Sequence, residues 1–180
     1  MPDTTVNRTE DEGEAQMAVD TSVIGKSTGA SKVTVERGPV ANFALAVLDE
    51  NPVYQSPDTA RATGFDAIPA PPTFSFAMQH WGKFPDDQPP DPTGGENAMR
   101  TVMGELFAKG GIVLHGEQEF EYHRPLVVGD VLVGEGKITD FYEKESKGKT
   151  MTFLVTETVW RDEKSDEPVV TERFNLIHRA

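Results

Sequence analysis

The sequence predicts an α+β fold, in which helices come first and an antiparallel sheet follows. Two observations support this order. Between residues 39 and 106 the apolar residues recur at the spacing of helical turns, whereas after residue 118 they alternate with polar residues or form runs. The helix expected to begin at Thr73 carries an aromatic stripe, which a sheet wrapped round this central helix would bury. Pattern alone supports that arrangement as one among several.

The N-terminal segment is acidic and poor in large apolar side chains. Residues 1–20 hold six acidic residues against one basic residue, Arg8. A segment of this kind cannot bury enough surface to offset the entropy that it loses on ordering. We therefore expect a mobile acidic tail over residues 1–20 and a single folded domain over residues 21–180.

Four helices are expected in the first part of the domain. The first begins near Pro39; the second begins at Ser56-Pro57 and ends at Gly64. Thr73 is placed to cap the third, and Gly110-Gly111 ends the fourth, after a loop over residues 84–97 that is rich in Pro, Asp and Gly. The first, third and fourth helices each carry an apolar stripe. In the first helix the stripe is Val40, Phe43, Ala44 and Val47, and in the third it is Phe74, Ala77, Met78 and Trp81. In the fourth helix it is Met99, Val102, Met103 and Leu106.

Strands are expected after the helices. Apolar and charged side chains alternate over residues 118–123, and the runs at 131–142, 150–161 and 168–178 are dense in β-branched and aromatic residues. The segments 147–149 and 162–167 between these runs are short and polar, as hairpin loops are. Strands joined by hairpins form an antiparallel sheet.

Composition excludes several classes of function. The formal net charge of −13 disfavours binding to the phosphate backbone of nucleic acid. The absence of cysteine excludes disulfides and thiolate chemistry. The four histidines lack metal-ligand spacing, so no metal site is expected. No apolar run approaches the ~18 residues of a membrane span, so we expect a cytoplasmic protein that does not bind membranes.

The segment Asp49-Glu50-Asn51-Pro52-Val53-Tyr54 is the most informative motif. It resembles the signature of the MaoC-like (R)-specific enoyl-CoA hydratases, which reads Asp-x-Asn-Pro-aliphatic-His after an apolar helix. The residues from Asp49 to Val53 match that pattern. Tyr54 stands where the family has its catalytic histidine.

A second group of motifs lies at Ala70-Pro71-Pro72-Thr73-Phe74 and at Arg124-Pro125-Leu126, which Gly129-Asp130 follows. These motifs are similar to the N-terminal-type (FAS1-like dehydratase) domain of the same family. That domain is the non-catalytic first repeat of peroxisomal hydratases, and it occurs in heterodimeric dehydratases of actinobacterial lipid metabolism. The resemblance covers roughly residues 22–178 and implies a hotdog fold, an antiparallel sheet wrapped round a central helix.

The resemblance also implies a chemistry. Hydration of a 2-enoyl thioester requires a carboxylate and an imidazole that hold one water between them. Asp49 is the expected carboxylate, Asn51 braces the turn, and backbone N–H groups at the start of the central helix polarise the thioester carbonyl. The substrate is a thioester of CoA or of acyl carrier protein, and no other cofactor is implied. The expected substrate-binding residues are Pro72, Thr73, Phe74, Met78, Trp81, His115 and Gln118.

Tyr54 does not fit this catalytic mechanism. Its phenol has a reference pKa of about 10 and is a poor base at neutral pH, so the chain alone is expected to lack a working catalytic pair. Asp49 then has one of two roles. It either only closes the turn, or it is the remaining half of a catalytic pair that has lost its imidazole. His115 and His123 share strand parity with Glu117, Glu119 and Glu121, and a continuous strand would expose both on one charged face.

Three functions therefore stay open. The first is a subunit of an (R)-specific enoyl-thioester hydratase or 3-hydroxyacyl-thioester dehydratase. It would form an acyl-binding wall beside a second hotdog subunit that carries the full Asp and His. The second is a non-catalytic, homodimeric acyl-CoA-binding protein. The third is an independently active hydratase that uses Asp49 with an unconventional partner group.

Overall fold

The computed structural model describes residues 19–146 and 148–180. The tail expected over residues 1–20 lies outside the described residues, apart from Val19 and Asp20. The Asp20 carboxylate accepts a hydrogen bond from the Ser22 N–H and starts a short 3-10 turn, η1 (Thr21–Val23). The division of the chain at residue 20 stays a prediction.

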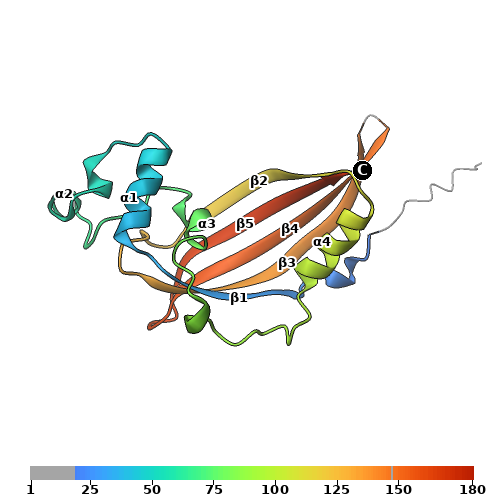
Figure 1. The fold of residues 1–180 in the computed structure, drawn as a ribbon, viewed down its shortest axis with the longest axis horizontal. Helices are drawn as coiled ribbons and strands as arrows, with labels where there is room; N and C mark the ends of the chain where they lie inside the picture. Colours follow the sequence, from blue (N-terminus) through green and yellow to red (C-terminus); the bar gives the residue numbers. More distant parts are fainter. Residues whose placement is uncertain (1–18, 147) are drawn as a thin grey trace, which may run out of the picture.

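In the part of the chain that the structure describes, five strands form one antiparallel sheet in the order β1-β3-β4-β5-β2 (Figure 1). The expected runs became β2 to β5, which confirms the antiparallel sheet. The first strand was not predicted, because its mostly small and polar residues do not alternate with apolar ones. The strands are β1 (Ser27–Thr34), β2 (Ile112–Tyr122), β3 (Val131–Ser146), β4 (Lys149–Asp162) and β5 (Pro168–Arg179).

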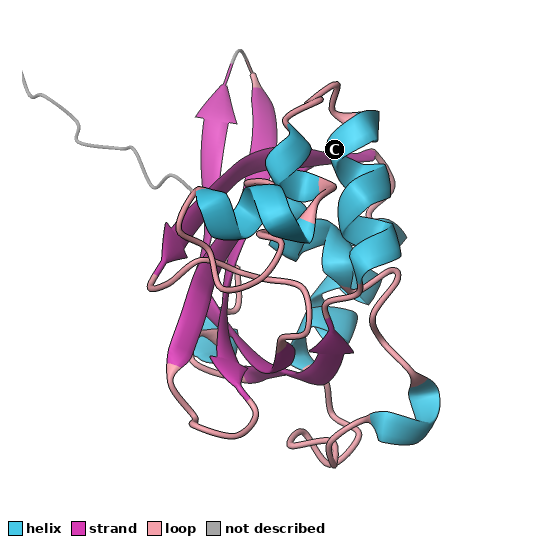
Figure 2. Cartoon of the chain, turned by 90° about the vertical axis from the view of Figure 1, so that its left-hand side faces the viewer, coloured by secondary structure: helices cyan, strands magenta, loops and turns pink. Residues whose placement is uncertain are grey.

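The helices gather on one face of the sheet (Figure 2). The expected helix start at Ser56 is capped, because its side chain accepts a hydrogen bond from the Thr59 N–H. Asn97, for which no cap was predicted, caps the fourth helix by accepting a hydrogen bond from the Arg100 N–H. None of the helices among the described residues is long and apolar enough to span a membrane. The helices and 3-10 turns are α1 (Arg37–Ala46), η2 (Pro52–Tyr54), α2 (Pro57–Ala62), α3 (Phe74–Met78), η3 (Pro85–Asp87) and α4 (Ala98–Ala108).

The central helix, α3, is shorter than predicted. It ends at Met78, so Trp81 lies beyond it and is 46% exposed, and Thr73 makes no side-chain cap bond. The cause lies at Gly82, whose carbonyl accepts a hydrogen bond from the Thr34 N–H at 2.9 Å. A Cβ at residue 82 would collide with the backbone of Thr34. This close approach to the end of β1 draws the chain out of the helix.

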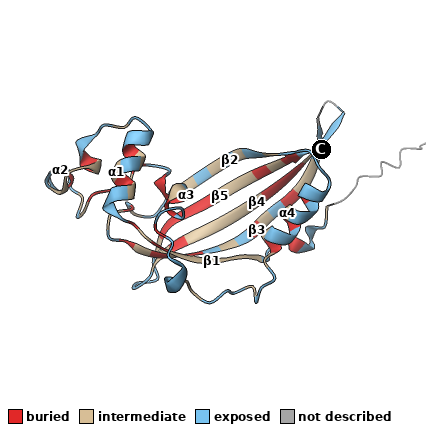
Figure 3. Cartoon of the chain, viewed as in Figure 1, coloured by how far each residue is buried: buried red, intermediate tan, exposed pale blue. Residues whose placement is uncertain are grey.

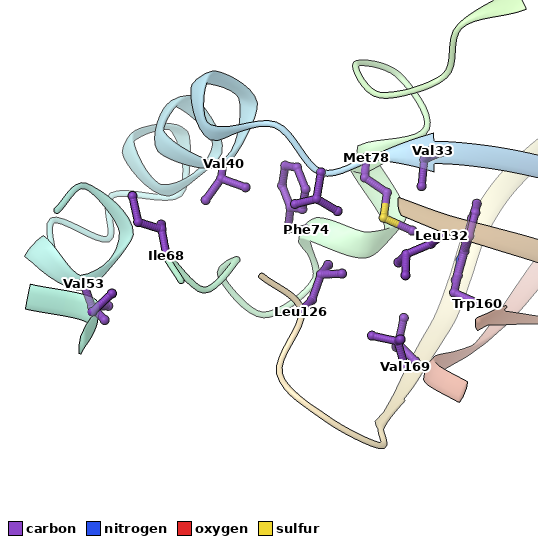
Figure 4. Close-up of a cluster of buried hydrophobic side chains, with 13 residues drawn as sticks. Val33, Val40, Val53, Ile68, Phe74, Met78, Leu126, Leu132, Trp160 and Val169 are labelled. Atoms are coloured by element: carbon purple, nitrogen blue, oxygen red, sulfur yellow. The ribbon is translucent and has the colours of Figure 1, made fainter. Parts of the chain in front are cut away.

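Among the described residues, the core consists of two clusters at opposite ends of the sheet. The first packs α1 and α3 against the sheet and includes Phe74, Met78, Leu132 and Trp160 (Figure 4). The second packs α4 against the other end, and its buried side chains are Val23, Ala98, Val102, Leu106, Ile138, Phe141, Leu154 and Leu176. We call the side of the sheet that carries both clusters its helical face. The middle of that face, between α3 and α4, is less deeply buried (Figure 3).

Candidate functional site

The signature loop follows α1 and is folded by its own polar side chains. The Asp49 carboxylate accepts a hydrogen bond from the Asn51 N–H at 3.1 Å, and the Asn51 side-chain oxygen accepts one from the Val53 N–H at 3.0 Å. These bonds cap η2 and tie the loop into a tight turn. Leu48 enters the turn with a φ of 60°, a conformation that is unfavourable for a leucine. The geometry fits the bracing role expected for Asn51.

Tyr54 ends the loop and is partly buried against the first core cluster. Burial raises the pKa of its phenol above the ordinary value of 10.0, and the neighbouring Asp49 carboxylate raises it further. A phenol in this environment keeps its proton at neutral pH. The environment therefore works against Tyr54 as a general base.

A pocket of about 380 Å³, which we call the loop pocket, opens beside these residues. Three of the predicted site residues, Asn51, Tyr54 and Pro72, line it together. Asp49 neighbours Tyr54 but is not one of the lining residues. The other lining residues are mostly apolar, and they are Val53, Thr63, Phe65, Pro69, Ala70, Tyr122, Pro125 and Leu126. Apolar lining with a few polar groups suits the reactive end of an acyl thioester.

The backbone N–H groups expected to polarise a thioester carbonyl already have acceptors. The Thr73 N–H donates to the Tyr122 hydroxyl at 3.2 Å, and the Phe74 N–H donates to the Pro71 carbonyl at 3.1 Å. Thr73 also has a positive φ of 70°, which marks backbone strain at this point. A substrate carbonyl that used the Thr73 N–H would have to displace Tyr122.

Tyr122 is a residue of this pocket that hydrogen-bonds at the start of α3 and that sequence reasoning missed. It is 40% exposed at the end of β2, and its hydroxyl also lies 3.5 Å from the Ser75 hydroxyl. In the sequence it is one more aromatic residue in an alternating strand. Only its pairing with β5 and the position of α3 bring it to the loop pocket.

The other residues predicted to bind substrate lie outside the lining of the loop pocket. Phe74 and Met78 are buried in the first core cluster, and the exposed Trp81 ring stacks on Phe74 with ring centroids 6.2 Å apart. His115 and Gln118 lie on the helical face of β2. Their roles in binding stay predictions.

The expectation that His115 and His123 share one charged face is wrong. Both are exposed, as predicted, but a bulge between His115 and Gln118 turns His115 to the helical face. There it packs against Phe76 and Phe174, with ring centroids 5.5 and 4.7 Å away. His123 stays on the opposite side, with Nε2 2.9 Å from the Thr171 hydroxyl. Neither histidine lines the loop pocket, so neither replaces the missing imidazole there.

The described residues contain no group of three or more His, Asp or Glu side chains arranged to hold a metal ion. His80, His115, His123 and His178 lie apart, and His178 is buried with Nε2 2.6 Å from the Gly110 carbonyl oxygen. Among the lining residues of the loop pocket, the titratable groups are those of Tyr54 and Tyr122, and the Asp49 carboxylate lies next to Tyr54. Chemistry built from this chain's own side chains would be proton transfer or hydrogen bonding.

The sheet and its helices define a hotdog protein, as comparison with solved structures shows. The HadBC (3R-hydroxyacyl-ACP dehydratase) complex of Mycobacterium tuberculosis superposes with a TM-score of 0.61 at 22% identity, over 88% of this chain and 99% of that chain. The ChsH1–ChsH2 complex of the same organism gives a TM-score of 0.66 at 22% identity, over 84% and 83%. At these identities the likeness establishes the fold.

Sequence relatives identify the family. Residues 22–172 match the family described as "FAS1-like, dehydratase domain region". A UPF0336 protein of Streptomyces avermitilis is 33% identical over 165 residues, covering 91% of this chain and 97% of the relative. A probable enoyl-CoA hydratase alpha subunit of Thermomonospora curvata is 30% identical over 141 residues, covering 77% of this chain and 43% of that protein. The chain belongs to the FAS1-like dehydratase-domain family, which confirms the predicted relationship.

Proposed function

We propose that this chain is one subunit of an (R)-specific enoyl-thioester hydratase or 3-hydroxyacyl-thioester dehydratase. It forms an acyl-binding wall, and a second hotdog subunit supplies the carboxylate and the imidazole. The substrate is a thioester of CoA or of acyl carrier protein, and the reaction uses no other cofactor. Support for the reaction class comes from family membership and from a relative named as a probable enoyl-CoA hydratase alpha subunit.

The observation that carries the proposal is the state of the signature loop. The turn is intact, since Asp49 and Asn51 hold it by hydrogen bonds to the backbone. Its last position, however, holds a phenol whose pKa is raised by burial and by Asp49. A turn kept in shape without its base favours a binding role over an independent catalytic one. The two solved complexes similar to this chain, HadBC and ChsH1–ChsH2, each contain two differently named components, which supports the need for a partner.

The proposal is tested by co-expression with a hotdog chain that carries the complete Asp-x-Asn-Pro-aliphatic-His motif. We expect the two chains to co-purify and to hydrate enoyl-CoA substrates of several chain lengths. The pure chain should bind an acyl-CoA but show no hydration of crotonyl-CoA. Steady-state turnover by the pure chain in the ordinary enzymatic range of ~1–1000 per second would contradict the proposal. Binding without activity in any complex would favour the homodimeric acyl-CoA-binding protein instead.

A further inference from the structure

Three polar side chains form a path from the loop pocket into the core, and we call Tyr122, Ser75 and Glu172 the hydrogen-bond relay. Tyr122 lines the loop pocket, and its hydroxyl lies 3.5 Å from the Ser75 hydroxyl. The Ser75 side chain is in turn a hydrogen-bond partner of the Glu172 carboxyl. Tyr122 is 40% exposed, whereas Ser75 is fully buried and Glu172 is 6% exposed. The relay therefore joins a phenol that a ligand can reach to a buried acid.

Three strands and α3 bring the relay together. Val170 of β5 is paired with Tyr122 of β2 on one side and with Trp160 of β4 on the other, and paired residues share a face of the sheet. Glu172 lies two residues further along β5, so its side chain is on the same face. Because Val170 and Trp160 belong to the first core cluster, which packs against α3, this is the helical face. Ser75 of α3 is thus placed over the sheet, between Tyr122 and Glu172.

The Tyr122 hydroxyl has one hydrogen to donate, and what it offers a ligand depends on where that hydrogen points. Its oxygen already accepts a hydrogen bond from the Thr73 N–H at 3.2 Å. The contact with Ser75 can run in either direction, because either hydroxyl can be the donor. If Ser75 donates, the Tyr122 hydrogen is free to point into the loop pocket. If Tyr122 donates, its hydrogen is used inside the protein and a ligand meets no donor from this residue.

The charge state of Glu172 selects between these two directions. A neutral carboxyl donates its proton to the Ser75 oxygen, and Ser75 then donates to Tyr122. An ionised carboxylate only accepts, so Ser75 donates to it and the Ser75 oxygen accepts from Tyr122 instead. Burial raises the pKa of the Glu172 carboxyl above its ordinary value, although Ser75 and Trp160 lower it. The neutral form, which frees the Tyr122 hydrogen, therefore persists to higher pH than in an exposed glutamate.

The surroundings of Glu172 leave its own proton as the switch. No charged side chain among the described residues contributes to the pKa shift of Glu172. Two titratable side chains lie on the same face: Tyr122, which belongs to the relay, and His115, which packs further along the sheet against Phe76 and Phe174. The other side chains that face Glu172 are uncharged, and they are Ser75 of α3, Phe120 of β2, and Thr158 and Trp160 of β4.

We propose that the Tyr122 hydroxyl donates a hydrogen bond to the thioester carbonyl oxygen in the loop pocket, and that Ser75 and Glu172 are positioning residues that direct its hydrogen there. The inference rests on the proposed acyl-thioester function. The Thr73 N–H already donates to Tyr122, so the phenol replaces that N–H as the donor to the carbonyl. Glu172 is not one of the residues that line the loop pocket. Ligand affinity thus depends on the proton of a carboxyl that does not touch the ligand.

The test compares two CoA ligands that differ in one group. Butyryl-CoA carries the thioester carbonyl, and the thioether S-butyl-CoA lacks it. Both are titrated calorimetrically into the full chain at a series of pH values from about 5 to about 8, below the range in which a phenol ionises. At the lowest pH we expect butyryl-CoA to bind about fivefold more tightly, the scale of one net neutral hydrogen bond. This preference should disappear as pH rises and Glu172 ionises, whereas the CoA phosphates are common to both ligands and cancel in the ratio.

Variants assign the effect to the relay. Tyr122→Phe should abolish the preference at every pH. In Glu172→Gln the amide oxygen accepts from the Trp160 indole, which only donates, so the amide N–H donates to Ser75. This variant should keep the preference and lose its dependence on pH. The matched control is Glu121→Gln, exposed and on the opposite face of β2, which should behave like the unchanged chain.

The outcomes separate the two proposals. Equal binding of the thioester and the thioether, or a preference that survives in Tyr122→Phe, overturns the inference and leaves the acyl-thioester function standing. A preference that does not change with pH in the unchanged chain overturns the role of Glu172. Failure of both CoA ligands to bind overturns the proposed function, and the inference with it. If Glu172→Gln does not fold, Ser75→Ala interrupts the relay at its middle, and a pH dependence retained in that variant would equally overturn the inference.

Discussion

The signature loop and the buried carboxyl of Glu172 use polar side chains in opposite ways. In the loop, Asp49 and Asn51 accept hydrogen bonds from the backbone two residues further on, so their polarity holds the turn in shape. Glu172 in β5 is 6% exposed, and burial raises the pKa of its carboxyl although the neighbouring Ser75 hydroxyl and Trp160 indole lower it. A hydrogen bond to the backbone of a turn stabilises the fold, whereas a buried carboxyl costs stability unless it is fully paired. The region that resembles an active site by sequence is thus the one whose polar groups serve the fold.

The largest expected effect is on the rate of hydration, and it tests whether the loop is an active site that lacks only its histidine. Tyr54→His places an imidazole five residues after the Asp49 carboxylate, as in the family signature. One placed acid–base group contributes ~100–10,000-fold to rate, so weak hydration of enoyl-CoA should appear above background. The measurement is steady-state hydration by the pure variant.

The control for this gain is the double variant Tyr54→His with Asp49→Ala, in which activity should be lost. Tyr54 packs against the first core cluster, so the thermal stability of both variants has to be measured as well. A folded Tyr54→His variant that binds enoyl-CoA without any gain in rate would show that the loop serves only packing and binding.

The next effect concerns the stability contributed by the buried Glu172. Glu172→Met replaces a buried carboxyl that has an unpartnered oxygen with an apolar side chain of similar length. Because an unsatisfied buried polar group costs about 1–3 kcal/mol, we expect the free energy of unfolding in urea to rise by a similar amount. A loss of stability would mean that Glu172 is already satisfied in the folded chain. Such a loss would remove the contrast between Glu172 and the loop.

The opposite sign is expected in the loop. Asn51→Ala removes the acceptor for the Val53 N–H and the cap of η2, and loss of such a cap typically lowers stability by about 0.5–2 kcal/mol. Asn51→Asp keeps the acceptor and is the matched control, with stability expected near that of the unchanged protein. If Asn51→Ala unfolds at the same urea concentration as Asn51→Asp, the cap contributes nothing.

The smallest effect is on how stability changes with pH. The folded protein raises the pKa of Glu172 above its ordinary value of 4.5, so the folded state binds this proton more tightly than the unfolded state does. Its contribution to stability is therefore fully present below that value and is lost as pH rises through the folded pKa. Urea titrations at a series of pH values should show a steeper decline above pH 4.5 in the unchanged chain than in Glu172→Met. Identical slopes would contradict a raised pKa.

The sequence predicted local features well. The runs that became β3, β4 and β5, the cap at Ser56, and the tight turn from Asp49 to Tyr54 all depend on residues close together in the chain. Periodicity and capping chemistry report on such neighbours, so these elements could be read directly.

Features that depend on distant contacts could not be read in this way. The early end of α3 follows from the approach of Gly82 to Thr34, and β1 forms from small and polar residues because it pairs with β3. Tyr122 reaches the loop pocket only through the folding of the sheet. The buried Glu172 of β5 likewise meets Trp160 of β4 and Ser75 of α3 only in the folded chain, and each of these residues looks unremarkable in its own segment.

The bulge in β2 has a consequence for comparison with relatives. Two residues, Gly116 and Glu117, lie between His115 and Gln118, whereas the paired segment of β5 has only Asn175 between Leu176 and Phe174. A Cβ at residue 116 would collide with the Asn175 carbonyl and with Ile177, so the extra residue fits where glycine stands. An alignment to a relative whose strand lacks the bulge therefore needs a one-residue gap beside Gly116. Without that gap, every position before it is matched to a side chain on the opposite face of the sheet.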